Sequence, residues 1–433
     1  MAVTATDTHR AIDAVWRIES PRLIGGLVRM VRDVSLAEDL AQDALVAALQ
    51  QWQESGIPEN PGAWLMAAAK HRAIDLFRRS KLLDRKHEEL GRELNARQEA
   101  LVPDFETALD DDIGDDLLRL VFISCHPVLS PEARVALTLR LLGGLTTEEI
   151  ARAFLMPEPT VAQRIVRAKR TLAEKSVPFE VPRGDERAAR LSSVLEVLYL
   201  IFNEGYSATA GDDWMRAGLC EEALRLGRIL AELAPQEPEV HGLVALMEIQ
   251  ASRAHARIGP SGEPILLLEQ NRALWDQLLI RRGLAALDRA GKIRGSQGPY
   301  ALQAAIAACH ARARTPEETD WARIVALYGE LANLAPSPVV ELNRAVAVAM
   351  AFGPAAGLEL VDALTAEPSL QAYHLLPSVR GDLLAKIGRT DEARAEFERA
   401  AALTRNTREQ ELLLNRARAC AEGSRGAGDK SGA

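Results

Sequence analysis

Polar and basic side chains recur at helical spacing between residues 159 and 170. The side chains that we expect on this face are Pro159, Thr160, Ala162, Gln163, Arg164, Arg167 and Arg170. Polar groups near the start of such a helix can reach base edges in the major groove, and arginines further along it can hold phosphates. The opposite stripe is apolar, at Val161, Ile165, Ala168 and Leu172. The spacing predicts a helix that packs along one side and contacts DNA with the other, although a solvated amphipathic helix has the same pattern.

The residues before this helix predict two further helix starts. Ser130 can cap a helix that has Pro131 at its first position, and Thr146 forms a capping box with Glu149. Two prolines, at positions 157 and 159, interrupt the helical pattern after Phe154. Residues 129–172 therefore have the pattern of a helix-turn-helix.

An earlier segment, residues 23–86, carries one acidic and one basic helix face. Ser35 and Glu38 have capping-box spacing at the start of its first helix. The outer face of that helix carries Asp39, Gln42, Asp43 and Val46. The next helix starts at Asn60 and Pro61. Its expected apolar positions are Trp64, Ala67, Ile74 and Phe77, and its polar ones are Lys70, His71, Arg72, Asp75, Arg78 and Arg79. Between residues 70 and 86, seven lysines and arginines stand against two aspartates. The acidic face suggests a protein partner, and the basic face suggests nucleic acid.

The order and spacing of the two segments resemble the sigma-70 family of bacterial RNA polymerase sigma factors, in the extracytoplasmic-function (ECF) type. AEDLAQDALVAAL is similar to the polymerase-binding helix of region 2, and NPGAWLMAAAKHRAIDLFRR is similar to the helix that melts promoters and reads the −10 element. Residues 129–172 are similar to region 4, which reads the −35 element. The resemblance implies that the face from Asp39 to Val46 binds the clamp helices of the largest polymerase subunit. It also implies a contact with the flap of the second-largest subunit.

By the same resemblance, the loop from Gln53 to Asn60, together with His71 and Arg72, would meet the opened −10 strand. Holding a single strand requires cations and surfaces on which bases can stack, and Trp52 and His71 are the candidates. For Trp52, ordinary core packing is the alternative. The chain departs from the family pattern at His71, where Asn is usual, and at Leu155, where a Gly is common in the turn.

Length and composition indicate several all-α domains. A chain of 433 residues is too long to fold around a single hydrophobic core. A hydrophobic content of 48% with only 4% aromatic residues is typical of closely packed helices. We find no convincing run of alternating strand residues. The net charge of −9 is matched by residues 88–116 alone, which hold eleven acidic residues against Arg92 and Arg97. This segment is expected to be an acidic linker. It is either a disordered solubilising tether or, as the resemblance implies, a thread through the basic channel of the polymerase.

Several classes of function lack their signals. The four cysteines are widely spaced, without metal-ligand spacing, so we expect reduced thiols and no metal. No Gly-rich phosphate loop or GxSxG elbow is present, which argues against an enzyme and against a cofactor. No apolar stretch is long enough to span a membrane, and the N-terminus lacks a basic region followed by an apolar one. We expect a soluble, cytoplasmic protein.

The second half contains an internal echo, because LAELAP at residues 230–235 recurs as LANLAP at residues 331–336. The offset of 101 residues is close to three tetratricopeptide (TPR) periods. One repeat is best matched at Gly381, Leu384, Gly388, Ala393, Phe397 and Ala400, although the consensus Trp and terminal Pro are missing there. The pattern predicts stacked helical hairpins with a concave surface for a protein or peptide.

The segment VLEVLYLIFNEGYSAT resembles one found in ECF sigma factors with a repeat-like extension, which is thought to regulate the sigma module. Its helix is expected to end at Gly205. Asn203, Glu204 and Tyr206 would then lie at an exposed turn, either as a docking site or as a helix end that packs within its own domain.

The expected organisation has five parts: region 2 (1–87), the acidic linker (88–116), region 4 (117–178), a TPR-like regulatory domain (185–422) and a disordered tail (423–433). The sequence predicts a transcription initiation factor that binds core RNA polymerase and promoter DNA and is controlled by its own C-terminal domain. The alternative is a DNA-binding regulator that has a TPR-like sensor domain and acts without polymerase. The acidic face of residues 39–46 and the basic helix of residues 70–86 favour the sigma factor, because an ordinary repressor needs neither.

Overall fold

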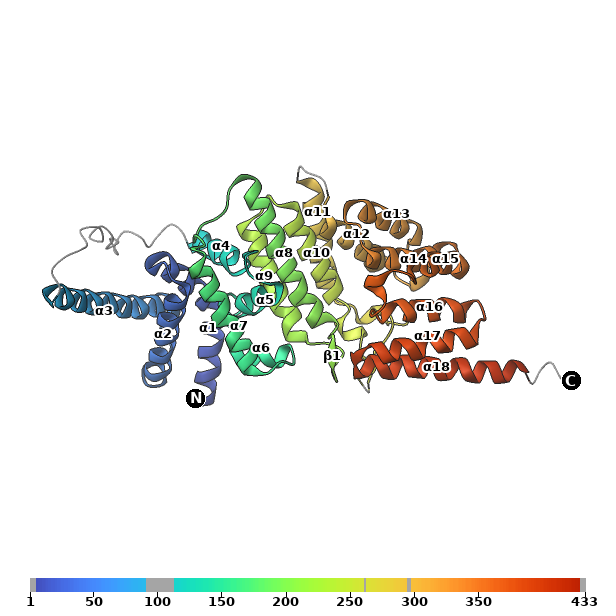
Figure 1. The fold of residues 1–433 in the computed structure, drawn as a ribbon, viewed down its shortest axis with the longest axis horizontal. Helices are drawn as coiled ribbons and strands as arrows, with labels where there is room; N and C mark the ends of the chain where they lie inside the picture. Colours follow the sequence, from blue (N-terminus) through green and yellow to red (C-terminus); the bar gives the residue numbers. More distant parts are fainter. Residues whose placement is uncertain (1–4, 91–112, 261, 294–296, 429–433) are drawn as a thin grey trace. The chain divides into compact units, whose positions relative to one another are not determined.

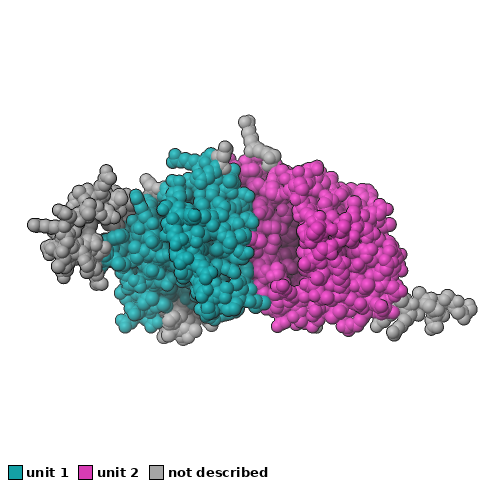
Figure 2. All heavy atoms as spheres, viewed as in Figure 1, with its two compact units in different colours: residues 1–197 teal, residues 198–433 magenta. Residues whose placement is uncertain are grey.

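The structure is a computed structural model that describes residues 5–90, 113–260, 262–293 and 297–428. The described residues are almost entirely helical, which confirms the predicted all-α class (Figure 1). The chain divides into two compact units, residues 1–197 and 198–433 (Figure 2). Within the described ranges, no helix is long and apolar enough to cross a membrane.

The described residues of the first unit form eight helices, the last of which continues into the second unit. They are α1 (Ala5–Val31), α2 (Val34–Ser55), α3 (Pro61–Leu90), α4 (Ile113–Ser124), α5 (Pro131–Leu141), α6 (Thr147–Ala153), α7 (Glu158–Glu174) and α8 (Gly184–Tyr206). The acidic linker predicted for residues 88–116 is therefore shorter at both ends, because α3 extends to Leu90 and α4 begins at Ile113. The rest of that expectation, residues 91–112, lies outside the described residues.

The helix starts follow the sequence in three cases and depart from it in one. Ser130 Oγ accepts a hydrogen bond from the Ala133 amide, and Thr146 and Glu149 form the expected capping box. The Asn60 side chain likewise accepts from the Ala63 amide at 3.0 Å. The predicted capping box of Ser35 and Glu38 is wrong. Asp33 caps α2 instead, and Glu38 turns into the protein with 3% of its surface exposed.

Apolar side chains from α1 to α7 form the interior of the first unit, in which α4 packs against α1. Helices α1, α2 and α3 bury Leu27, Leu40, Trp52 and Leu65, whereas α4 to α7 bury residues such as Phe122, Leu137, Ile150 and Ile165. The buried positions of α3 are Leu65, Ala69 and Ala73. The expected apolar stripe on α3 was therefore misplaced, and Phe77 is 39% exposed.

The second unit is a succession of helices with short 3₁₀ turns. It contains the end of α8 and then α9 (Ala217–Leu233), α10 (Pro238–Ala251), η1 (Ala254–Ala256), η2 (Arg272–Leu274), α11 (Gln277–Lys292), α12 (Pro299–Arg312), η3 (Pro316–Glu318), α13 (Trp321–Leu334), α14 (Pro338–Phe352), α15 (Pro354–Leu364), η4 (Pro368–Leu370), α16 (Leu375–Lys386), α17 (Thr390–Leu403) and α18 (Thr407–Gly428). Consecutive helices pack against each other, as in α13–α14, α16–α17 and α17–α18 (Figure 1).

The internal echo occupies equivalent places in this succession. Ala234 and Ala335 end α9 and α13 with similar backbone angles, and each donates its amide to the leucine carbonyl four residues earlier. Each is followed by a helix with proline at its first position, Pro238 or Pro338. The repeated letters therefore encode the same helix–turn–helix junction twice.

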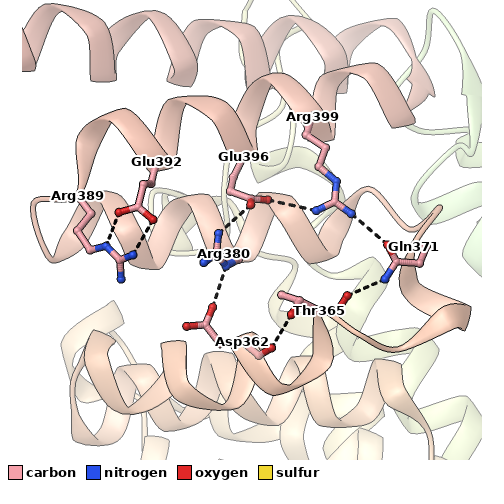
Figure 3. A network of polar contacts seen from close by, with 8 residues as sticks. All are labelled: Asp362, Thr365, Gln371, Arg380, Arg389, Glu392, Glu396 and Arg399. Atoms are coloured by element: carbon pink, nitrogen blue, oxygen red, sulfur yellow. Dashed lines mark hydrogen bonds and ion pairs between the residues drawn. The ribbon is translucent and has the colours of Figure 1, made fainter.

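The hairpin predicted around Gly381 is present as α16 and α17. A Cβ on Gly381 would lie 3.0 Å from the Phe397 ring, so a larger residue there would push the ring aside by a few tenths of an ångström. Polar contacts join the hairpin to α15 and η4 (Figure 3). Arg380 donates to Asp362 and to Glu396, both at 2.8 Å, and Arg399 donates to Gln371 at 3.5 Å.

A two-residue parallel sheet joins the beginning and the end of the second unit. β1 (Ala210–Gly211) pairs with β2 (Arg405–Asn406). Asn406 is 1% exposed, and its Nδ2 donates to the carbonyls of Ala208 and Asp213 at 3.2 and 2.8 Å. No pattern in the sequence indicates this pairing.

Candidate nucleic-acid and polymerase interface

Helix α7 separates its two faces as expected. The four apolar positions, Val161, Ile165, Ala168 and Leu172, are at most 5% exposed. On the other side, Pro159, Thr160, Gln163, Arg167 and Arg170 are exposed, and Ala162 and Arg164 are half-buried. Arg164 donates to Met156 Sδ at 3.5 Å, and Arg170 pairs with Glu174 at 3.3 Å. Arg167 is the exposed arginine in the middle of this face.

The turn before α7 keeps a left-handed residue despite the missing glycine. Leu155 has a φ of 49° and a side chain that is 56% exposed. A leucine in this conformation is strained by about 1–2 kcal/mol. The leucine that replaces the usual glycine therefore strains the turn, but α6 and α7 both form.

Sequence reasoning missed one residue on the outer face of α7. Val166 is 63% exposed and lies three residues after Gln163 and one before Arg167. An exposed β-branched side chain suits an apolar contact such as the methyl group of thymine. Val166 is apolar, so a pattern of polar and basic residues does not mark it as part of the outer face.

On the polar face of α3, some side chains are exposed and others are half-buried or paired with a residue of α2. His71, Asp75 and Arg78 are exposed, and Lys70 and Arg72 are half-buried. Arg72 pairs with Asp43 of α2 at 3.3 Å. Burial, together with the nearby charge of Arg29, lowers the pKa of Lys70. The side chain of Arg79 lies outside the described residues.

Trp52 lies in the core, which corrects the expectation that it stacks on a base. Its side chain is 2% exposed, and its ring meets Trp64 edge-to-face at a centroid distance of 5.2 Å. A covered ring offers no face to a nucleotide. His71 remains exposed, as do Gln53 to Ile57, Glu59 and Asn60 of the neighbouring loop.

The acidic face of α2 is exposed at Asp39, Asp43 and Val46. Val46 keeps 49% of its surface in solvent. Gln42 is half-buried and donates to Glu38 at 2.8 Å, so one of the four expected residues points its amide into the protein.

Glu38 itself joins α2 to α5 and α7. It accepts from Arg140 Nε of α5 at 2.6 Å and pairs with Lys169 Nζ of α7 at 2.5 Å. Burial alone would raise the pKa of Glu38, but Lys169 and Arg140 outweigh burial and hold that pKa below its ordinary value. We call Glu38, Arg140 and Lys169 the Glu38 clasp.

Asn203, Glu204 and Tyr206 do not form the expected exposed turn. All three are half-buried, and α8 continues one residue beyond Gly205 to Tyr206. Glu204 pairs with Arg216 and accepts from Thr209 Oγ1 at 2.9 Å. Gly205 allows α9 to approach, because a Cβ there would lie 2.6 Å from the Cys220 amide nitrogen. The helix end packs within its own domain, which was the alternative interpretation.

The first half of α8 is attached to α4 and α5 by buried polar contacts within the first unit. Arg190 donates to the Phe122 carbonyl at 3.0 Å, and Ser193 Oγ donates to the Cys125 carbonyl at 2.6 Å. Arg134 donates to Ser193 and pairs with Glu196 at 2.8 Å. Arg134, Arg190 and Ser193 are all at most 7% exposed.

Comparisons with known proteins match separate families to the N-terminal segments and to the C-terminal part of the chain. Family models match sigma-70 region 2 over residues 16–82, sigma-70 region 4 over residues 119–172 and a family of unknown function, DUF6596, over residues 190–291. The chain is 45% identical over 390 residues to an uncharacterized protein of Rhizobium meliloti, covering 90% of this chain and 91% of that protein.

Two named relatives share the N-terminal part. The RNA polymerase sigma factor CarQ of Myxococcus xanthus is 30% identical over 142 residues, which are 32% of this chain and 74% of CarQ. The probable ECF RNA polymerase sigma factor SigI of Mycobacterium tuberculosis is 24% identical over 181 residues, 41% of this chain and 60% of SigI. No solved structure matches the chain.

These matches and the two helical segments define a sigma factor for transcription initiation. The chain belongs to the sigma-70 family of RNA polymerase sigma factors and is of the ECF type, with DUF6596 in its C-terminal extension. The resemblance inferred from the sequence is thereby confirmed.

Proposed function

We propose that α7 reads the −35 element, that α3 with the preceding loop holds the opened −10 strand, and that α2 binds the clamp helices of core RNA polymerase. The observation that carries the proposal is the division of α7, whose apolar side is buried while Thr160, Gln163 and Arg167 are exposed. Polar groups in the first turns of such a helix suit base edges, and arginines later in it suit phosphates.

For the −10 strand, support comes from the exposed side chains His71 and Arg78 and from the exposed loop before α3. His71 offers a ring on which a base can stack, and Arg78 offers a phosphate contact. For the polymerase, support comes from the exposed carboxylates of Asp39 and Asp43 beside exposed Val46. An apolar centre flanked by charges is typical of a specific protein interface.

We further propose that the C-terminal domain, which we regard as TPR-like, controls the sigma module through α8. The DUF6596 match begins at residue 190, on the half of α8 that is bonded to α4 and α5. A change that moves α8 must break the hydrogen bonds of Arg190 and Ser193 to the backbone of region 4. Control by this domain therefore has a physical route to the −35 reader.

Binding to purified core polymerase and run-off transcription test the first proposal. Reversing two charges, in Asp39→Arg with Asp43→Arg, is expected to abolish core binding and initiation while the helical content stays unchanged. Asp13→Arg, which reverses an exposed acid on α1 outside the proposed interfaces, is the matched control and is expected to keep both activities. If the double variant binds core polymerase like the parent chain, the clamp assignment is wrong. If the parent chain does not bind core polymerase at all, a regulator that acts without polymerase replaces this proposal.

The control proposal is tested by Ser193→Ala in the full chain, compared with Ser192→Ala, an exposed neighbour on α8. We expect Ser193→Ala to change the run-off yield relative to the parent while core binding persists, and Ser192→Ala to have no effect. Equal yields from all three chains would argue against communication through α8.

A further inference from the structure

Three arginines of the second unit lie close together in its interior. Arg253 follows α10, Arg257 follows η1, and Arg272 begins η2. Arg253 is 7% exposed, and Arg257 and Arg272 are half-buried. We call these three residues the arginine cluster.

Aromatic rings and carbonyl oxygens surround the cluster. The Arg257 guanidinium lies 3.6 Å from the Tyr206 ring centroid and donates to the Tyr206 carbonyl at 3.0 Å. The Arg272 guanidinium lies 5.0 Å from the Trp275 ring centroid and donates to the carbonyls of His310 and Ala313. These contacts hold two of the three arginines in fixed orientations.

Arg253 is the unpaired member. Its guanidinium lies 5.8 Å from the ring centroids of both Tyr206 and Trp275, and its buried Nε has no hydrogen-bond partner. Among the described residues, no carboxylate forms an ion pair with any member of the cluster. Glu248 pairs with Arg228 and Arg282, and Glu204 pairs with Arg216. Glu317 and Glu318 act on Arg272 through their charge without forming an ion pair with it.

The surroundings of the cluster respond to its uncompensated charge. Burial, followed by the charges of Arg253 and Arg272, lowers the pKa of His310 to about 4, so this histidine is neutral at physiological pH. Burial also lowers the pKa of Arg257 and of Arg272, and in both cases the charge of Arg253 acts in the same direction. For Arg272, the charges of Glu317 and Glu318 offset part of this lowering. His310 Nδ1 and Trp275 Nε1 are buried and have no hydrogen-bond partner among the described residues.

Such an arrangement has a direct chemical interpretation. Burying a cation without a counter-charge is costly, and proteins normally place a carboxylate beside it. Here the unpaired guanidinium, an indole N–H and a neutral imidazole lie among rings on a rigid helical framework. Guanidinium groups bind planar or tetrahedral oxyanions through charge-assisted hydrogen bonds.

We propose that the arginine cluster is the binding site of a small anion that carries a carboxylate or phosphate group, with Arg253 as its central contact. The ligand is a small molecule because Arg253, Trp275 and His310 are each at most 8% exposed, which a segment of protein or nucleic acid could not reach. The site goes beyond the proposed function. Its test does not depend on whether the C-terminal domain has a role in transcription.

The test is thermal unfolding of the full chain titrated with inorganic phosphate in one arm and with succinate in the other, at ionic strength held constant with sodium chloride. A saturable rise in the midpoint is expected in at least one arm, and the arm that responds identifies the anion as phosphate or carboxylate. At ligand 100-fold above its Kd, the unfolding equilibrium constant should fall about 100-fold. Isothermal titration calorimetry with the same anion gives an independent Kd.

Two variants decide the role of Arg253. R253M should remove the saturable rise and unfold at a higher temperature than the parent in the absence of anion, because it removes a buried unpaired charge. The matched control R323M replaces an arginine on α13 that is 56% exposed, and it should respond to the anion like the parent. If R253M does not fold, R253K is used instead, and it should bind at least tenfold more weakly.

Three results would overturn the proposal. One is the absence of a saturable response in both arms. Another is a response that rises linearly with salt, as excluded anions produce on any protein. The third is an unchanged Kd in R253M, or in R253K where R253M does not fold.

Discussion

Removing the Glu38 carboxylate should loosen α7 from α2. In Glu38→Ala, Arg140 and Lys169 lose their shared partner while their side chains are only 21% and 12% exposed. Breaking a buried ion pair from one side costs about 3–5 kcal/mol. Arg140 keeps its hydrogen bond to the Leu145 carbonyl at 3.1 Å, so we expect the lower end, about 3 kcal/mol.

Hydrogen exchange of the backbone amides measures this loss locally, in the full chain. A loss of about 3 kcal/mol corresponds to a roughly 100-fold fall in protection of α7, because each 1.4 kcal/mol is tenfold. Asp43→Ala is the matched control on the same helix, because its ion pair with Arg72 is 60% exposed on the aspartate side. That pair should contribute less than about 1 kcal/mol. If α7 keeps its protection within threefold in Glu38→Ala, the clasp does not hold the two segments together.

The pH dependence of the same contact has a definite sign. Since the pKa of Glu38 is lowered on folding, its contribution is complete above the ordinary carboxyl range, about pH 4. The contribution is lost as the pH falls through the lowered value. The difference in α7 protection between the parent chain and Glu38→Gln should therefore be largest near neutrality and vanish in acid. A difference that grows on acidification would contradict the assigned direction.

Three further changes test other parts of the structure. Leu155→Gly should raise the thermal unfolding midpoint of the first unit, because it relieves left-handed strain worth about 1 kcal/mol, and a lower midpoint would contradict the strain. Arg167→Ala should weaken promoter binding on all sequences and reduce the salt slope of log K by about 1, measured by fluorescence anisotropy with core polymerase present, and an unchanged slope would remove Arg167 from the phosphate contacts. Asn406→Ala should lower the free energy of unfolding of the second unit by about 3 kcal/mol in urea, because it removes two hydrogen bonds donated by a buried amide and the cap of α18. Asn406→Asp keeps an acceptor for the cap but turns a buried carboxylate oxygen toward the carbonyls of Ala208 and Asp213, so it should lose at least as much.

The sequence predicted the parts of this chain that depend on neighbouring residues. Capping at Ser130 and Thr146, and the buried stripe of α7, follow from interactions within one or two helical turns, so their pattern is visible in the letters. The repeated LAELAP and LANLAP segments likewise encode a local junction. The family resemblance rested on such local patterns taken in order, and the comparisons confirmed it.

Interactions between residues far apart in the chain could not be predicted in this way. Glu38 lies four residues before Gln42 and three after Ser35, so its spacing fits a capping box as well as an inward contact. Its partners Arg140 and Lys169 are more than a hundred residues away, and only the folded unit brings them to α2. Trp52 shows the same ambiguity, because an aromatic residue at the end of a helix suits a core and a base-stacking surface equally.

Charge is the property that local patterns describe least well in this protein. The net charge of the chain is negative, and its local patterns mark cations only on amphipathic helix faces. Yet Arg253 of the second unit is buried among aromatic rings and forms no ion pair with a described residue. An arginine that follows a hydrophobic helix reads in sequence as a helix-ending surface residue. Arg257 and Arg272 donate to backbone carbonyls, whereas the buried Nε of Arg253 has no hydrogen-bond partner among the described residues. That difference gives the second unit a chemical property that its helical repeats alone do not imply.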